Sequence, residues 1–273
     1  MSEKVIKLPV GQLDAMGTKI IDEATITEFT AKVYKELGKR TNQQNAETVE
    51  DVILKNCVVA IGEKKNPSPL DLASLLAADR DYLILKIKQL SFGDETKGGF
   101  TCINCNEKSG ISLSIEKDFN VWTLKPLESS DVHFPDVGLP VRFFTIKDEI
   151  SKLTLKCRYD TGSDRAKASQ FSKGNPVEFK MRLIASCILE IETPDVKLTG
   201  PVNLSYIENL PSRVWFNIST EWDKNQPGID PIMKVECPHC GSENMWEIDP
   251  ADFFSMAPQK TNRGEKLMKL SGS

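Results

Sequence analysis

The chain has 273 residues, of which 40% are hydrophobic and 27% charged, a mixture typical of a globular protein with a substantial core. Its net charge of −4 lacks the positive footprint of a protein that neutralises many phosphates, which disfavours nucleic-acid binding. The sequence contains no run of about 18 apolar residues and no signal peptide at its start, so we expect neither a membrane-spanning nor an exported protein.

Residues 1–67 are expected to form an N-terminal helical segment. Thr25 and Glu28 have the spacing of a capping box, and apolar residues follow at helical intervals as far as Gly38. A second helix is expected to carry Cys57 together with Val49, Val52 and Ile53, and the spacing of this cysteine indicates a buried side chain and not a metal ligand. A proline-rich break follows this helix.

Residues 68–125 are expected to form a helix, a cysteine knuckle and a strand. Asp79 is the predicted N-cap of an amphipathic helix that ends at Gly93. Cys102 and Cys105 follow, with two residues between them. Alternating apolar residues after this pair predict a strand.

Residues 126–200 are expected to form an inserted subdomain of mixed α/β structure. The sequence predicts a hairpin over residues 141–157, a loop at residues 160–164, and then a helix that leads into a strand. The two cysteines of this region, Cys157 and Cys187, are expected in its core.

Residues 201–256 repeat the order of the first unit. Ser212 is the predicted N-cap of a helix, and Cys237 and Cys240 form a second knuckle before another strand. A basic C-terminal tail, residues 257–273, completes the chain.

The two units are interpreted as an internal repeat. Gly93 precedes Cys102 by nine positions, and Gly228 precedes Cys237 by the same interval. The physical interpretation is two helix-knuckle-strand units about a pseudo-twofold axis, each of which contributes two thiolates to one site. A coincidence between common elements is the alternative.

The two knuckles predict one zinc site with the ligands Cys102, Cys105, Cys237 and Cys240. Four sulfur ligands leave no open position for an activated water, so the Zn²⁺ is expected to be structural and to hold the second half of the chain on the first. Its loss should then unfold the body of the protein. Two separate pairs of reduced thiols are the alternative, and His239 inside the second knuckle is a second candidate ligand.

Catalytic patterns are missing from the sequence. The two histidines, His133 and His239, lie in a turn-like segment and in a knuckle, and neither accompanies a nucleophile pattern. Glycine-rich phosphate loops and the zincin helix motif are absent. We therefore expect a non-enzymatic protein with no small-molecule substrate.

The combination of helix and knuckle motifs resembles the family of T-even-type contractile phage baseplate and baseplate hub assembly proteins. The similarity extends over about residues 70–125 and 200–256. The residues that carry it are 79–87, 91–95, the pair Cys102 and Cys105, the segment 237–241, and the pair Phe253 and Phe254.

The resemblance implies a structural or chaperone-like assembly protein whose partners are baseplate and hub proteins or further copies of itself. It implies a location in the bacterial host cytoplasm during assembly and in the tail baseplate of the virion. The fold class expected is α+β, with a helical N-terminal segment and a body built on a two-knuckle zinc ribbon. A zinc-ribbon module that binds nucleic acid or accompanies transcription is the alternative function.

Overall fold

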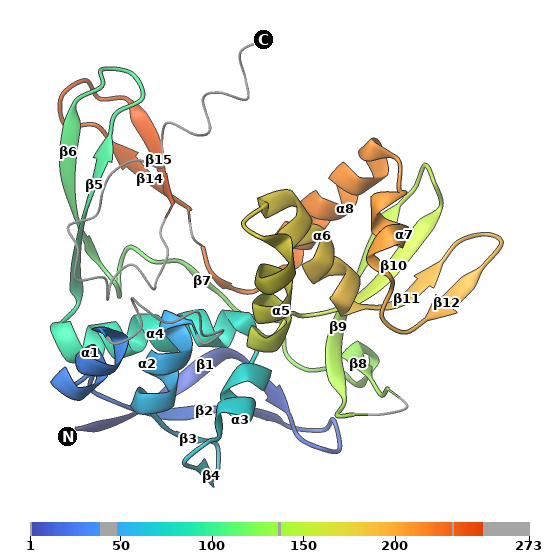
Figure 1. The fold of residues 1–273 in the computed structure, drawn as a ribbon, viewed down its shortest axis with the longest axis horizontal. Helices are drawn as coiled ribbons and strands as arrows, with labels where there is room; N and C mark the ends of the chain where they lie inside the picture. Colours follow the sequence, from blue (N-terminus) through green and yellow to red (C-terminus); the bar gives the residue numbers. More distant parts are fainter. Residues whose placement is uncertain (1, 39–47, 136–137, 231, 248–273) are drawn as a thin grey trace.

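The structure is a computed structural model, and it describes residues 2–38, 48–135, 138–230 and 232–247. It contains both helices and antiparallel sheets, as the α+β class requires (Figure 1). The buried apolar residues form two large clusters and one small cluster. The predicted basic tail, residues 257–273, lies outside the described residues.

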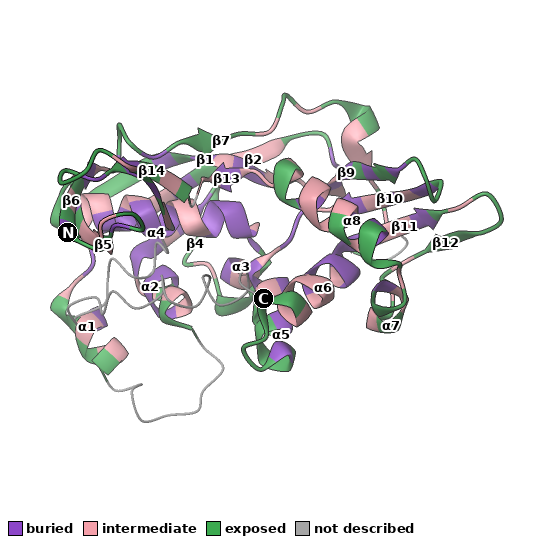
Figure 2. Cartoon of the chain, turned by 90° about the horizontal axis from the view of Figure 1, so that it is seen from above, coloured by how far each residue is buried: buried purple, intermediate pink, exposed green. Residues whose placement is uncertain are grey.

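The first large cluster lies between a four-stranded antiparallel sheet and four helices. The strands, in their order in the sheet, are β1 (Glu3–Leu13), β2 (Ile20–Thr27), β3 (Val58–Ile61) and β4 (Lys64–Lys65). The helices are α1 (Ala31–Gly38), α2 (Val49–Cys57), α3 (Pro69–Ser74) and α4 (Ala77–Phe92). Figure 2 shows the buried residues along α4 and along the strands that it covers.

The prediction of an N-terminal helical segment over residues 1–67 is incomplete, because β1 to β4 lie in this range together with α1 and α2. Thr25 does not begin a helix; it lies in β2, where it pairs with Val5. The missed signal is the period of two in Ile6, Leu8 and Val10, which are buried on one face of β1. The predicted helix that carries Val49, Val52, Ile53 and Cys57 is confirmed as α2, and this cysteine is fully buried.

The prediction that Asp79 caps α4 is also wrong. The N-cap position is Leu76, and Asp79 lies in the first turn with its side chain fully buried. Its two carboxylate oxygens accept the backbone N–H groups of Val10 and Gly11, each at 2.9 Å. This carboxylate therefore attaches α4 to β1. The predicted end of α4 at Gly93 is confirmed.

The second large cluster lies between a five-stranded antiparallel sheet and four helices. The strands, in their order in the sheet, are β12 (Lys197–Thr199), β11 (Ile188–Glu192), β10 (Leu153–Arg158), β9 (Val141–Asp148) and β8 (Val132–His133), and a short 3₁₀ helix, Ser129–Asp131, precedes β8. The helices are α5 (Gly162–Ser172), α6 (Pro176–Cys187), α7 (Leu204–Glu208) and α8 (Ser212–Asn225). The middle of the chain contains both helices and strands, and Cys157 and Cys187 are both fully buried in this cluster, as predicted.

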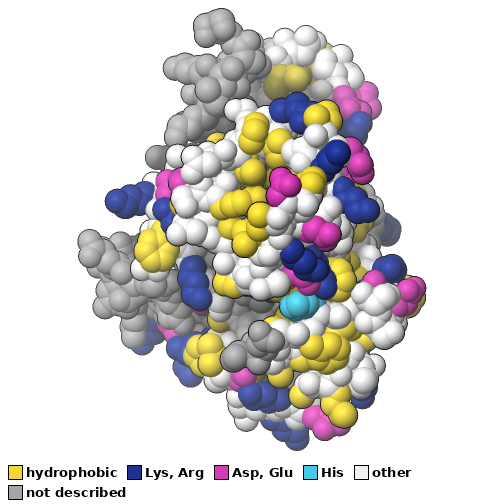
Figure 3. Space-filling model, turned by 90° about the vertical axis from the view of Figure 1, so that its right-hand side faces the viewer, with side chains coloured by type: hydrophobic (Ala, Val, Ile, Leu, Met, Phe, Trp, Pro, Cys, Tyr) yellow, Lys and Arg dark blue, Asp and Glu magenta, His cyan; other side chains and the backbone are white. Residues whose placement is uncertain are grey.

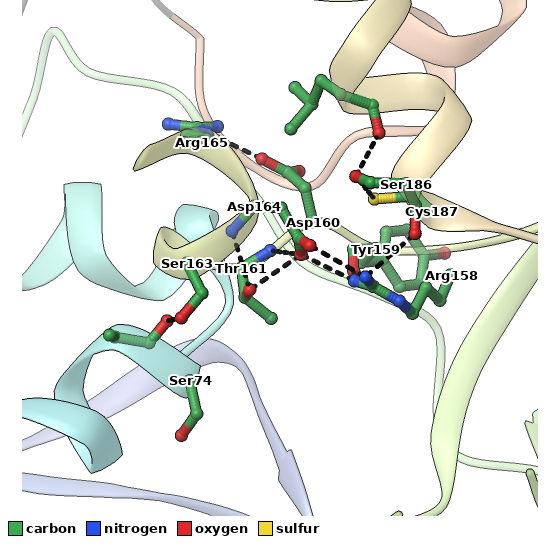
Figure 4. Close-up of polar contacts among 12 residues, drawn as sticks. Ser74, Arg158, Tyr159, Asp160, Thr161, Ser163, Asp164, Arg165, Ser186 and Cys187 are labelled. Carbon is green, nitrogen blue, oxygen red and sulfur yellow. Dashed lines mark hydrogen bonds and ion pairs between the residues drawn. The ribbon is translucent and has the colours of Figure 1, made fainter. Parts of the chain in front are cut away.

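Residues 160–164, expected as a loop, instead contain the start of α5. Thr161 is the N-cap and forms a capping box with Asp164. Asp164 also accepts two hydrogen bonds from the Arg158 guanidinium, at 2.7 and 2.9 Å (Figure 4). Small and acidic residues are common both in turns and at helix N-termini, so this segment alone does not distinguish the two.

The start of α5 also joins the two large parts of the molecule. Arg165 donates to Asp160 at 2.7 Å and to Asp81 of α4 at 2.9 Å. Ser163 donates from its hydroxyl to the carbonyl of Ala73 at 3.2 Å (Figure 4). Contacts of this kind fix α5 against the helices of the first cluster.

The side of the molecule where β10 to β12 lie presents a mixed surface. Figure 3 shows small groups of hydrophobic side chains on this face, separated by side chains of both charge signs. Lys156 illustrates the mixture, because it lies 3.2 Å from Glu190 and 4.0 Å from the ring centroid of Phe143. In the described residues, no helix has the length and apolar character needed to cross a membrane.

Candidate metal centre

Each cysteine pair lies at the tip of an antiparallel hairpin. The first hairpin consists of β5 (Glu95–Thr101) and β6 (Lys108–Ser114), and the second of β14 (Ile232–Glu236) and β15 (Glu243–Glu247). Two further short strands, β7 (Val121–Trp122) and β13 (Gly228–Ile229), pair with each other near the base of the hairpins. The hairpins lie side by side and extend away from the two large cores (Figure 1). The prediction of a helix, a knuckle and a strand in each unit does not include β5 and β14, the strands that precede the two knuckles.

The two units share one constant offset of 135 positions. The helices α4 and α8 begin at Ala77 and Ser212, which differ by this number. The hairpin register agrees as well, because the pair Thr101 and Lys108 corresponds to the pair Glu236 and Glu243. The two units therefore have the same spacing from the helix start to the knuckle, as an internal repeat would require. Phe254, the predicted counterpart of Phe119, lies outside the described residues.

The backbone of the two knuckles has the same hydrogen bonds. In the first, the N–H of Cys102 donates to Glu107 at 2.9 Å, and the N–H of Asn106 donates to the Cys102 carbonyl at 3.0 Å. In the second, the N–H of Cys237 donates to Ser242, and the N–H of Gly241 donates back to Cys237, both at 2.9 Å. Asn106 and Gly241 have φ angles of 60° and 71°, a left-handed conformation that asparagine and glycine tolerate.

The four sulfurs form one compact group. The Sγ of Cys102 lies 3.6 Å from that of Cys240, and the Sγ of Cys105 lies 3.7 Å from that of Cys237. All four ligand atoms lie within 4.8 Å of one another. Tetrahedral zinc with Zn–S bonds of about 2.3 Å places its sulfurs about 3.8 Å apart, whereas a disulfide needs about 2.05 Å. The structure thus brings the two predicted pairs together, in an arrangement that fits a tetrahedral metal ion.

The four thiols have unequal surroundings. Cys102 and Cys237 are buried, Cys105 is partly buried and Cys240 is exposed. The Cys240 thiol donates a hydrogen bond to the Ser242 hydroxyl oxygen at 3.3 Å. The interaction with the Ser242 side chain is the main cause that lowers the pKa of Cys240 to about 6. A thiolate is the form that binds a metal, so this contact favours coordination through Cys240 at neutral pH. Against a backbone hydrogen bond that lowers it, burial and the neighbouring thiols raise the pKa of Cys105 to about 12 in the metal-free site.

A small apolar cluster fills the space beneath the knuckles. Its members are Leu85, Leu113, Ile115 and Phe119, with Ile111, Ile229, Met233 and Trp246 packed against them. Trp246 approaches so closely that a Cβ at Gly98 would lie 2.3 Å from its ring. Glycine at position 98 therefore allows the second hairpin to pack against the first.

Other candidate residues lie elsewhere. His239 is exposed and does not belong to the sulfur group. His133 lies on β8, 3.4 Å from the Lys156 amine and 3.9 Å from Glu190. In the part of the chain that the structure describes, the four cysteines form the only group of three or more potential metal ligands. The polar residues around the sulfurs, Ser242 among them, were not predicted, because serine and asparagine near a knuckle are also ordinary turn residues.

These observations define a protein of two cores and two hairpins, with four thiols from distant parts of the chain at one centre. Comparison with known protein families identifies the family to which the chain belongs. Residues 1–255 match the family described as T4 bacteriophage base plate protein, and the chain belongs to this family. No curated protein and no solved structure matches the chain. The family match confirms the resemblance found in the helix and knuckle motifs, and it supports a structural role in a phage baseplate.

Proposed function

We propose that this chain is a non-enzymatic structural or assembly protein of a contractile phage tail, with one structural Zn²⁺ held by Cys102, Cys105, Cys237 and Cys240. The family match supports the baseplate role. The observation that carries the metal proposal is the group of four thiols within 4.8 Å. A site with four sulfur ligands has no position for an activated water, so its contribution is stability and not catalysis.

The zinc has a specific mechanical task in this proposal. A two-stranded hairpin alone is only marginally stable in water, and the apolar cluster between these hairpins is small. The ion links the unit of residues 68–125 to the unit of residues 201–256, and it closes the long inserted segment between them. It thereby fixes two hairpins that neither large core contains.

The hairpins offer apolar surface to other proteins. Ile103 at the first knuckle and Met245 on β15 are each 63% exposed. We propose that such side chains contact baseplate and hub proteins, or a second copy of the chain, during assembly in the host cytoplasm. The same contacts would persist if the protein stays in the virion tail.

The experiment is affinity purification of the tagged chain from cells that assemble the phage particle, with mass spectrometry of the bound proteins. We expect tail and hub proteins with the wild-type chain and their loss with the double variant Cys102→Ser/Cys237→Ser. The control is Cys57→Ala/Cys157→Ala, which removes two buried thiols outside the centre and should leave the partners bound. Recovery of polymerase subunits, or unchanged partners in the double serine variant, would contradict the proposal.

A further inference from the structure

Asn244 connects the second hairpin to the first knuckle. It lies on β15 and is 2% exposed. Its side-chain oxygen accepts the N–H of Ile103 at 2.9 Å, and its amide nitrogen lies 3.6 Å from the sulfur of Cys102. The same nitrogen donates to the carbonyl of Ser242 at 2.9 Å. One side chain thus contacts the backbone and a sulfur of the first knuckle and the backbone of the second.

The internal repeat supplies a comparison within the same molecule. The counterpart of Asn244, 135 positions earlier, is Ser109, and the counterpart of Ile103 is Pro238. Proline has no N–H, so the side-chain oxygen of an asparagine at position 109 could accept no hydrogen bond from position 238. Ser109 is buried, and its hydroxyl has no hydrogen-bond partner among the described residues. The asparagine therefore lies on the second hairpin, where the first knuckle offers it the N–H of Ile103.

The environment of Cys102 explains why such a contact matters there. Cys102 is fully buried, so water cannot solvate its sulfur, whereas Cys240 is exposed. Within the described residues, the donors directed at the sulfur of Cys102 include two backbone N–H groups of its own knuckle, those of Cys105 and Asn104, and the side-chain amide of Asn244 from the opposite hairpin. Four thiolates around one Zn²⁺ carry an excess of negative charge, and hydrogen bonds to sulfur reduce the cost of burying it.

We propose that Asn244 is the positioning residue of the metal centre: it holds the first knuckle against the second hairpin and stabilises Cys102 as a thiolate ligand. This inference rests on the proposed zinc site. It adds an outer residue to the four ligands and makes the two halves of the repeat unequal. The first knuckle is held by a strand side chain from the opposite hairpin. Among the described residues, Ser109 makes no matching hydrogen bond to the second knuckle, which instead receives the side-chain amide of Asn104 on the sulfur of Cys240 at 3.6 Å.

The first test is zinc affinity of the full chain, measured by competition with a chromophoric chelator. Asn244→Ala should bind zinc about 10-fold to 100-fold more weakly than wild type, the usual effect of losing an outer partner of a metal ligand. Asn244→Asp keeps an oxygen for the N–H of Ile103 but replaces the donor with a carboxylate near the sulfurs, so it should also weaken binding. The matched control is Ser109→Ala, which removes a hydroxyl without a described partner and should bind zinc as wild type does.

The second test separates positioning from general loss of packing. In the cobalt-substituted protein, the sulfur-to-metal charge-transfer band should move to lower energy in Asn244→Ala and Asn244→Asp, because a thiolate without this hydrogen bond is a better electron donor. Ser109→Ala should leave the band in place. Wild-type affinity and an unmoved band in both Asn244 variants would overturn the inference and leave the zinc proposal intact. A wild-type chain that binds no metal would overturn both.

Discussion

At the scale of single residues, Asp79 shows how a buried carboxyl group organises this fold. The first turn of α4 places its carboxylate against two consecutive N–H groups of β1, which satisfy one oxygen each. Burial raises the pKa of Asp79 to about 7, against the effect of these two hydrogen bonds, and the charge of Asp22 raises it further. The sequence predicts an acidic residue at the start of this helix but not its partner, because β1 lies almost 70 residues earlier in the chain.

The raised pKa of Asp79 predicts a pH-dependent stability. The pKa is about 7 in the folded protein and 3.8 in its ordinary state, so the folded state retains a proton that the unfolded state has released. The associated stability is fully present below about pH 4 and is lost as the pH rises through about 7. The free energy of unfolding, from chemical denaturation, should fall between about pH 5 and pH 8 in wild type.

Asp79→Asn should remove this fall. It should also lower stability by about 1–3 kcal/mol, since one backbone N–H loses its acceptor. Asp14→Asn is the control, because Asp14 is an exposed carboxylate whose pKa is lowered, first by the backbone N–H of Lys19. That control should retain the wild-type slope, and an equal slope in Asp79→Asn would show that another group titrates.

At the scale of elements, hairpin packing depends on a position without a side chain. Gly98 on β5 lies under Trp246, whereas Gly110 on β6 has its nearest potential contact at 4.0 Å. Sequence spacing predicts the knuckles and the strand after each one, since two cysteines with two residues between them are a specific pattern. It does not predict β5 or β14 as strands. Glycines at 98 and 99 conceal the alternation of β5, and their role depends on a tryptophan from the other half of the chain.

Gly98→Ala should destabilise the hairpin pair by about 1–3 kcal/mol, because the new methyl group overlaps the ring of Trp246. The fluorescence of this tryptophan should change with it. Gly110→Ala makes the same chemical change in the paired strand and should cost much less. Urea denaturation of the zinc-loaded proteins measures both effects. Similar stabilities for the two variants would show that the ring does not pack as described.

At the scale of the whole molecule, two large cores hold most of the buried apolar residues, and the hairpins share only the small third cluster. From the sequence we expect the whole body of the protein to unfold without zinc. The two large cores, which lie away from the cysteines, argue instead for a local effect on the hairpins. Each large core has a sheet and helices of its own, and Arg165 links the cores through Asp81 and Asp160. Such contacts between distant segments have no local pattern, so sequence spacing could not predict them.

Removal of the metal should therefore open the hairpins and leave the cores folded. In hydrogen exchange monitored by mass spectrometry, chelation should increase exchange in β5, β6, β14 and β15, while α2, α4, β10 and α6 keep their protection. Addition of Zn²⁺ should restore the hairpins. Uniform loss of protection across the chain would show that zinc supports the whole body, and no change would show that the hairpins hold without a metal.

The central claim is that four cysteines from two repeated hairpins hold one structural zinc in a baseplate protein. Native mass spectrometry of the full chain, expressed and purified without added metal, tests it most directly. We expect one Zn²⁺ per chain in wild type and in Cys57→Ala/Cys157→Ala, and none in Cys102→Ser/Cys237→Ser. A wild-type chain at its metal-free mass, or a double serine variant that still retains zinc, would contradict it.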